Sequence, residues 1–82
     1  MSRAETLDAL TPGAHARVVA ISTDLPAGDR RRLLELGFFP GTRVTTVRRS
    51  PLGDPIAYEV RGLVVALRRA QARLIEIEDD GS

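Results

Sequence analysis

Apolar and polar side chains alternate along several short stretches of this chain. The clearest alternation places Ile56, Tyr58 and Val60 at every second position, with smaller or charged side chains between them. A period of two is typical of a strand that buries one face. Together with segments rich in Val, Ile and Thr, it predicts five strands, at residues 14–21, 42–49, 56–61, 63–67 and 73–78.

Between the first two predicted strands the spacing becomes helical. Leu33 and Leu36 lie three residues apart, which predicts a helix over residues 27–36 that turns both leucines toward the core. Thr23 or Asp24 is expected to cap the first amide groups of this helix, because short polar side chains accept hydrogen bonds from free N–H groups.

Gly37 is expected to end the helix. Glycine adopts the left-handed conformation needed there, and Phe38 and Leu33 would then pack together as in a Schellman motif. Pro40 prevents the helix from restarting, and Pro40 with Gly41 suits a type II turn.

Smaller features complete the expected outline. Leu7 and Leu10 have the spacing of one helical turn, residues 68–72 suit another turn, and a bulge is expected near residues 19–20, where alternation breaks. The predicted fold class is therefore mainly β: a small barrel of about five strands, with one α-helix after the first strand and a short helical turn before the last. We expect it to be closed, because closure removes open sheet edges.

Composition limits what such a chain can do. Its 82 residues form a single domain, 1–82, with a core over about 6–78, a loose lead-in over 1–5 and a flexible acidic tail over 79–82. Twelve basic and eleven acidic residues nearly cancel, and cysteine is absent. The apolar run 63–67 is too short to cross a bilayer, and the first residues lack the apolar stretch of a signal peptide. We therefore expect a soluble, cytoplasmic protein without direct membrane insertion.

Few residues could carry chemistry. His15 is the single histidine and cannot form a zinc site or a hydrolytic triad without partners. Hard divalent ions favour carboxylates, but the acidic residues near the end lie on a solvent face or in the tail: Glu76, Glu78, Asp79 and Asp80. We therefore predict no enzyme activity, no catalytic residue, no cofactor and no metal ligand, and the ligand set does not support direct Fe²⁺ binding.

Nucleic-acid binding is also a weak interpretation. The three arginines of 30–32 fan over about 200° of a helix and form no compact patch. Only three aromatic residues are available for stacking on bases.

Three motifs in order give the chain a resemblance to the FeoA family over about residues 6–78. The first runs from Arg32 to Thr42 and contains Leu33, Leu36, Gly37, Phe38, Pro40 and Gly41. The second runs from Arg48 to Ile56 and contains Gly53, Asp54 and Pro55, and the third begins at Gly62 and continues through Val65 to Arg69 and Ala72. Departures include Thr46, in place of a common aliphatic residue, which is expected to leave its core layer slightly underfilled, and Gln71, where an acidic residue is common.

The resemblance implies an SH3-like barrel and an accessory role in ferrous iron uptake. Members of this family are cytoplasmic partners of FeoB, the membrane GTPase that imports ferrous iron. The same module forms the C-terminal domain of iron-dependent repressors. The resemblance therefore implies FeoB as the partner and modulation of its transport or GTPase cycle by contact.

A partner surface is expected on two rigid segments. Phe38 is needed for the helix cap, so Phe39 is expected to point outward, and Pro51 and Leu52 lie in a loop stiffened by prolines. Arg48 and Arg49 would form the polar rim of this surface. An equally supported interpretation has Phe39 completing the core.

Two other functions stay open on the sequence alone. One is a regulatory SH3-like module that binds a protein segment or a transition metal, although a groove for proline-rich ligands needs aromatic residues and Tyr58 is the one tyrosine. The other is a small nucleic-acid-binding barrel, whose affinity would fall steeply with salt. Weak self-association is also left open.

Overall fold

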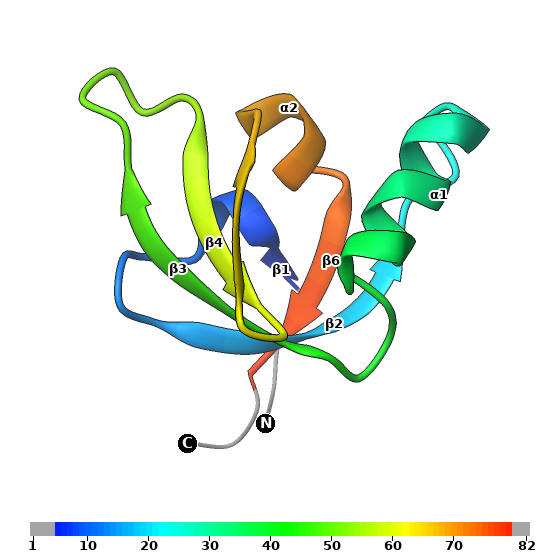
Figure 1. Cartoon of the computed structure of the whole chain (residues 1–82), viewed down its shortest axis with the longest axis horizontal. Helices are drawn as coiled ribbons and strands as arrows, with labels where there is room; N and C mark the ends of the chain where they lie inside the picture. Colours follow the sequence, from blue (N-terminus) through cyan, green and yellow to red (C-terminus); the bar gives the residue numbers. More distant parts are fainter. Residues whose placement is uncertain (1–4, 80–82) are drawn as a thin grey trace.

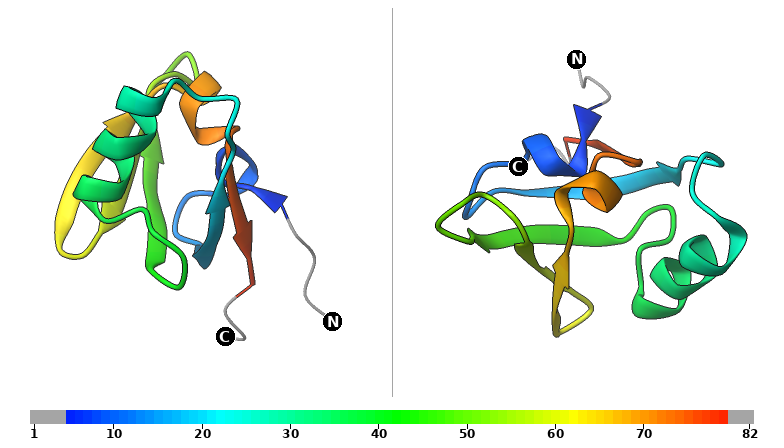
Figure 2. Two further views of the ribbon diagram at one scale, coloured as in Figure 1. Left: turned by 90° about the vertical axis from the view of Figure 1, so that its right-hand side faces the viewer. Right: turned by 90° about the horizontal axis from the view of Figure 1, so that it is seen from above.

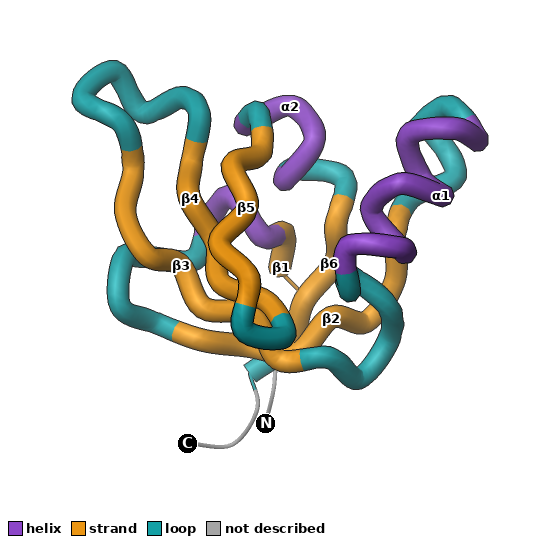
Figure 3. The backbone as a smooth tube through the Cα atoms, in the orientation of Figure 1, coloured by secondary structure: helices purple, strands orange, loops and turns teal. Residues whose placement is uncertain are grey.

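The structure, a computed structural model, describes residues 5–79, and the predicted lead-in and tail lie mostly outside them. The described part contains six strands and three helical segments (Figures 1 and 3). In chain order they are β1 (Glu5–Thr6), the 3-10 helix η1 (Leu7–Ala9), β2 (His15–Ile21), α1 (Ala27–Leu36), β3 (Arg43–Arg49), β4 (Ile56–Val60), β5 (Leu63–Leu67), α2 (Arg69–Ala72) and β6 (Ile75–Glu78).

All six strands form one antiparallel sheet in the order β1-β6-β2-β3-β4-β5. The sheet curls strongly, as the side and top views show (Figure 2). The predicted mainly β class, with one helix after the first long strand, is confirmed. The expected closure is wrong, because β1 and β5 remain as edges and α1 and α2 occupy the open side instead.

The predicted count of five strands missed β1. This strand pairs Glu5 with Ile77 and Thr6 with Glu76 on β6. Two residues are too few to show a period of two, so no pattern in the sequence could indicate this strand. The other five strands were predicted to within two residues at each end.

Helix α1 has the predicted bounds, but its start differs from the prediction. Pro26 occupies the N-cap position, and neither Thr23 nor Asp24 caps the helix with its side chain. Instead, the Ser22 hydroxyl accepts a hydrogen bond from the backbone N–H of Asp24 at 3.1 Å. A side chain one residue before the expected caps thus fixes the approach to the helix.

The predicted C-terminal cap is confirmed. Gly37 has φ of 116°, the Phe38 N–H donates to the Leu33 carbonyl, and the Gly37 N–H donates to the Leu34 carbonyl, both at 3.0 Å. These two bonds define a Schellman motif. Phe38 and Leu33 are both buried in the same core cluster.

The core lies between the curled sheet and the helices. Its largest fully buried side chains are Tyr58, Phe38, Leu7, Ile56, Ile75, Ile77, Val44, Val60 and Thr46. The predicted bulge is confirmed by a register shift between Val18 and Ala20, and a second shift lies between Thr46 and Arg48.

Thr46 makes hydrogen bonds within the core. Its side chain is fully buried, and its hydroxyl donates to the Leu10 carbonyl at 3.2 Å. Its backbone N–H also donates to the Ala14 carbonyl at 3.0 Å. The Thr46 hydroxyl, which an aliphatic residue would lack, thus binds the segment between η1 and β2. The sequence alone could not reveal this contact, because the two segments are far apart in the chain.

Candidate partner-binding surface

The loop between β3 and β4 exposes Leu52 to solvent, and hydrogen bonds within the loop hold its backbone. The Ser50 hydroxyl and N–H both donate to the Pro55 carbonyl, at 2.7 and 3.1 Å, and the Gly53 N–H donates to the Ser50 carbonyl at 2.7 Å. The Asp54 carboxylate accepts the Arg69 N–H at 3.0 Å, which ties the loop to α2. Leu52 is 95% exposed in this loop.

Phe39 also lies outside the core. Its side chain is 38% exposed, whereas that of the preceding Phe38 is fully buried. The Arg61 guanidinium carbon lies 5.4 Å from the centre of the Phe39 ring, within the range of a cation–π contact. The interpretation in which Phe39 completes the core is therefore wrong, and the ring belongs to the surface near the β4–β5 turn.

The structure does not bring Phe39 and Leu52 together. Phe39 precedes β3 and Leu52 follows it, so the two lie at opposite ends of a strand about 20 Å long (Figure 3). A partner that contacts both must extend along β3. The strand predicted over residues 42–49 implies this separation, since Phe39 precedes that strand and Leu52 follows it.

The two rim arginines have different surroundings. Arg48 is exposed, whereas Arg49 is half-buried and donates from Nη2 to the carbonyls of Asp8, at 3.1 Å, and Leu10, at 3.4 Å. The Arg49 Nε is buried and has no hydrogen-bond partner among the residues that the structure describes. Its guanidinium thus holds the end of η1 against β3, and of the two arginines Arg48 is the one that faces solvent.

Tyr58 is buried beside the same segment. Its hydroxyl donates to the Leu7 carbonyl at 3.3 Å. Burial raises the pKa of Tyr58 to about 12, and the negative charge of Asp8 adds to the effect. The phenol therefore stays neutral in the core and cannot line a surface groove for proline-rich ligands.

Strand β5 carries exposed apolar residues that sequence reasoning did not select. Leu63 is 53% exposed and Val64 is 68% exposed. Five consecutive apolar residues are typical of a strand buried on both faces, whereas β5 is largely exposed. The exposure follows from the position of β5 at the edge of the sheet.

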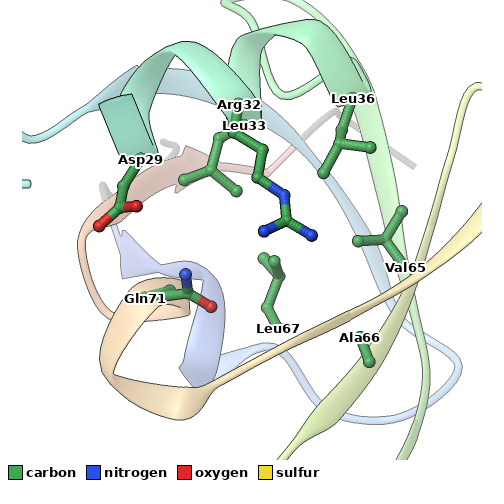
Figure 4. A pocket seen from close by; sticks show the side chains of 8 residues that line it. All are labelled: Asp29, Arg32, Leu33, Leu36, Val65, Ala66, Leu67 and Gln71. Atoms are coloured by element: carbon green, nitrogen blue, oxygen red, sulfur yellow. The ribbon is translucent and has the colours of Figure 1, made fainter. Parts of the chain in front are cut away.

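A slot lies between β5 and α1 (Figure 4). Apolar side chains from both elements line it, and Arg32 lies across it above Leu67, with Asp29 and Gln71 to one side. The cavity measures about 80 Å³. Pockets that take drug-sized ligands measure about 300–1,000 Å³, so this slot has the size of a side chain.

Metal ligands do not gather in the part of the chain that the structure describes. No three His, Cys, Asp or Glu side chains among residues 5–79 come close enough to hold an ion. No helix in this range is both long enough and apolar enough to cross a membrane.

Comparison with known proteins shows that this chain is similar to iron transport proteins. A fusion of Fe(2+) transport protein A with the Fe(2+) transporter FeoB, from Porphyromonas gingivalis, is 45% identical over 49 residues. That match covers 60% of this chain, and the chain spans only 6% of the fusion's length.

Solved structures give the same picture. The FeoA protein of Chlorobium tepidum has a TM-score of 0.86 and 32% identity, over 93% of this chain and 70% of that one. The FeoA of Stenotrophomonas maltophilia, solved with zinc and described as a prokaryotic SH3 domain protein, has a TM-score of 0.76 and 36% identity, over 88% and 87%. The SH3-like fold is thus confirmed.

A manganese-dependent transcriptional repressor shares the fold alone. Its TM-score is 0.82 at 22% identity, over 96% of this chain and 43% of the repressor. The FeoA domain model, in contrast, matches residues 5–79, nearly the whole chain. The chain therefore belongs to the FeoA family.

Proposed function

We propose that this chain is a non-enzymatic, cytoplasmic accessory protein of ferrous iron uptake, which binds a FeoB transporter and modulates it by contact. The observation that carries the proposal is the fusion in Porphyromonas gingivalis, where a domain 45% identical over 49 residues belongs to the same chain as FeoB. Domains joined in one chain in one organism commonly act together as separate chains in another.

The surface supports a role by contact. Leu52 and Phe39 are apolar side chains on segments fixed by backbone hydrogen bonds and a cation–π contact. Such groups lose little conformational entropy when a partner covers them, so most of their burial contributes to affinity. Arg48, exposed on β3 between them, would lie within the same interface.

Iron uptake in cells tests this function. A strain that lacks the chain but keeps its own FeoB would be complemented with the wild type, Leu52→Ser, Phe39→Ser or Leu34→Ser, and uptake of radioactive Fe²⁺ measured. Leu34→Ser is the matched control, because Leu34 is 39% exposed, as Phe39 is, but lies on α1. We expect the wild type and Leu34→Ser to restore uptake, and the other two variants to restore less than half.

Equal uptake with all four proteins, at equal abundance, would count against this surface. Equal uptake with and without the chain would overturn the function.

Regulation of a separate DNA-binding chain is the second candidate. The shared fold with the manganese-dependent repressor favours it, but the identity of 22% supports the fold only. Capture of FeoB, and not of a repressor, by the purified chain decides between the two.

A further inference from the structure

Strand β5 leaves one row of backbone groups without a strand partner. Among the strands of residues 5–79 it pairs with β4 alone, through a two-residue turn in which Arg61 and Gly62 both have positive φ, at 53° and 82°. These values indicate a type I′ turn, whose flanking residues Val60 and Leu63 exchange hydrogen bonds. Because bonding alternates along an antiparallel pair, the N–H and C=O groups of Val64 and Ala66 point away from β4.

This edge lacks the usual protection against pairing. Natural edge strands carry charges, prolines or bulges that prevent another chain from adding to the sheet. Residues 63–67 include no charge and no proline, and their pairing with β4 is regular. Val64 is 68% exposed and Leu63 53% exposed, so β5 is uncovered near the β4–β5 turn, and farther along it faces α1 across the slot. Such an edge is suited to accept an added strand.

The side-chain slot beside the edge supplies specificity. Val65 and Leu67 line it from β5, and Leu33 and Leu36 line it from α1. In strand addition, every second side chain of the incoming segment points to the same face of the sheet. One aliphatic side chain of an added strand would therefore enter the slot of about 80 Å³ while its backbone pairs with Val64 and Ala66.

Charge at the slot indicates the chemistry of the segment. The Arg32 guanidinium lies across the slot in Figure 4, and Arg61 stands over Phe39 beside the β4–β5 turn. Asp29 is the one carboxylate that lines the slot. A segment with a carboxylate beside its aliphatic anchor would pair with Arg32, as charged rims of interfaces do.

We propose that β5 and the slot bind an extended segment of the partner by strand addition. An aliphatic side chain of this segment would enter the slot, and an Asp or Glu side chain beside it would pair with the Arg32 guanidinium. The inference rests on the proposed function, since it places this segment in FeoB. A second copy of the chain is disfavoured as the occupant, because pairing β5 with β5 would bring the two Arg32 guanidinium groups to the same interface.

Hydrogen exchange measured by mass spectrometry tests the pairing on intact proteins. The full chain would be labelled alone and with full-length FeoB in nanodiscs. In the free chain the amides of Val64 and Ala66 should exchange fast, and those of Leu63, Val65 and Leu67 slowly. We expect FeoB to slow exchange by two amides in a peptide covering 63–67, and to leave a peptide covering β2 unchanged.

Two variants test the contacts. Ala66→Pro removes an outward N–H without removing a bond to β4, and Arg32→Glu reverses the charge over the slot. Arg31→Glu is the matched control, because Arg31 is exposed on α1 and does not line the slot. We expect Ala66→Pro and Arg32→Glu each to weaken FeoB binding about tenfold, and Arg31→Glu to change it less than about threefold.

The outcomes separate the two proposals. If the wild type binds FeoB but exchange over 63–67 is unchanged, strand addition is wrong and the proposed function stands. Wild-type affinity in a folded Ala66→Pro variant leads to the same conclusion. If Ala66→Pro does not fold, the exchange measurement on the wild type decides. Protection over 63–67 that appears without FeoB at high protein concentration identifies a second copy as the occupant and overturns the assignment. Absence of wild-type binding overturns the proposed function and this inference with it.

Discussion

The Tyr58 hydroxyl donates a hydrogen bond to the Leu7 carbonyl at 3.3 Å, and this bond joins β4 to η1 across 51 positions of sequence. Arg49 donates to two neighbouring carbonyls of the same segment. The N-terminal segment is thus fixed to the sheet by side chains from β3 and β4, in addition to the two-residue strand β1.

Tyr58→Phe should lower the free energy of unfolding by about 1 kcal/mol, because it removes a buried hydrogen bond and keeps the ring. The Leu7 carbonyl still accepts the Leu10 N–H at 3.1 Å, which limits the loss. Urea unfolding at neutral pH measures the difference. A variant as stable as the wild type would show that the hydroxyl contributes nothing to attaching η1.

The same residue predicts a dependence on alkaline pH. Its pKa is about 12 in the folded protein, against 10.0 in the unfolded chain. A raised pKa means that the folded state favours the neutral phenol, so this contribution is complete below pH 10 and is lost as the pH rises from 10 to 12. The loss should reach roughly 2–3 kcal/mol. Tyr58→Phe should lack this component, and parallel curves for the two proteins would contradict the assignment.

Gly37→Ala should destabilise the fold by about 1–3 kcal/mol. Gly37 has φ of 116°, and an added Cβ would lie 2.9 Å from Arg61 Cδ and 3.2 Å from Val60 Cγ2. Gly28→Ala is the control of opposite sign, because Gly28 lies in the first turn of α1 and an added Cβ would meet no described atom within 4 Å outside its neighbours and the helix backbone. That variant should be more stable by about 0.5–1 kcal/mol. Chemical denaturation compares the two, and equal effects would refute the role given to the cap.

Thr46→Val should cost about 1 kcal/mol although valine fits the buried site by size. The hydroxyl of Thr46 binds the Leu10 carbonyl, which would keep only its longer contact with Arg49. Thr45→Val, at a half-buried position next to it in β3, is the control and should change stability by less than about 0.5 kcal/mol. A gain of stability in Thr46→Val would mean that the layer is underfilled after all.

Local signals explain how far the sequence could predict this fold. The bounds of α1 followed from leucine spacing, Gly37 and Pro40, all of which act within one turn of the chain. Strand β1 was missed because its two residues are specified by β6, far away in sequence. The open side was missed for the same reason, since closure depends on where β5 ends relative to β1.

The candidate surface shows the same limit. The exposure of Leu52 could be predicted, because it lies in a proline-rich loop, whereas for Phe39 the sequence supported exposure and burial equally. The inward turn of Arg49 and the exposure of Val64 could not, since both depend on neighbours from other elements. Sequence reasoning thus located stiff local segments and missed the sheet edge.

Direct binding to FeoB tests the central claim most directly. Isothermal titration of full-length FeoB in nanodiscs with the purified full chain, at physiological salt, measures the affinity and the stoichiometry of the pair. The account predicts saturable binding with one chain per FeoB subunit, weakened about tenfold or more by Leu52→Ser and unchanged by Leu34→Ser. Titration without heat of binding, confirmed by the absence of a complex in size-exclusion chromatography, would contradict it.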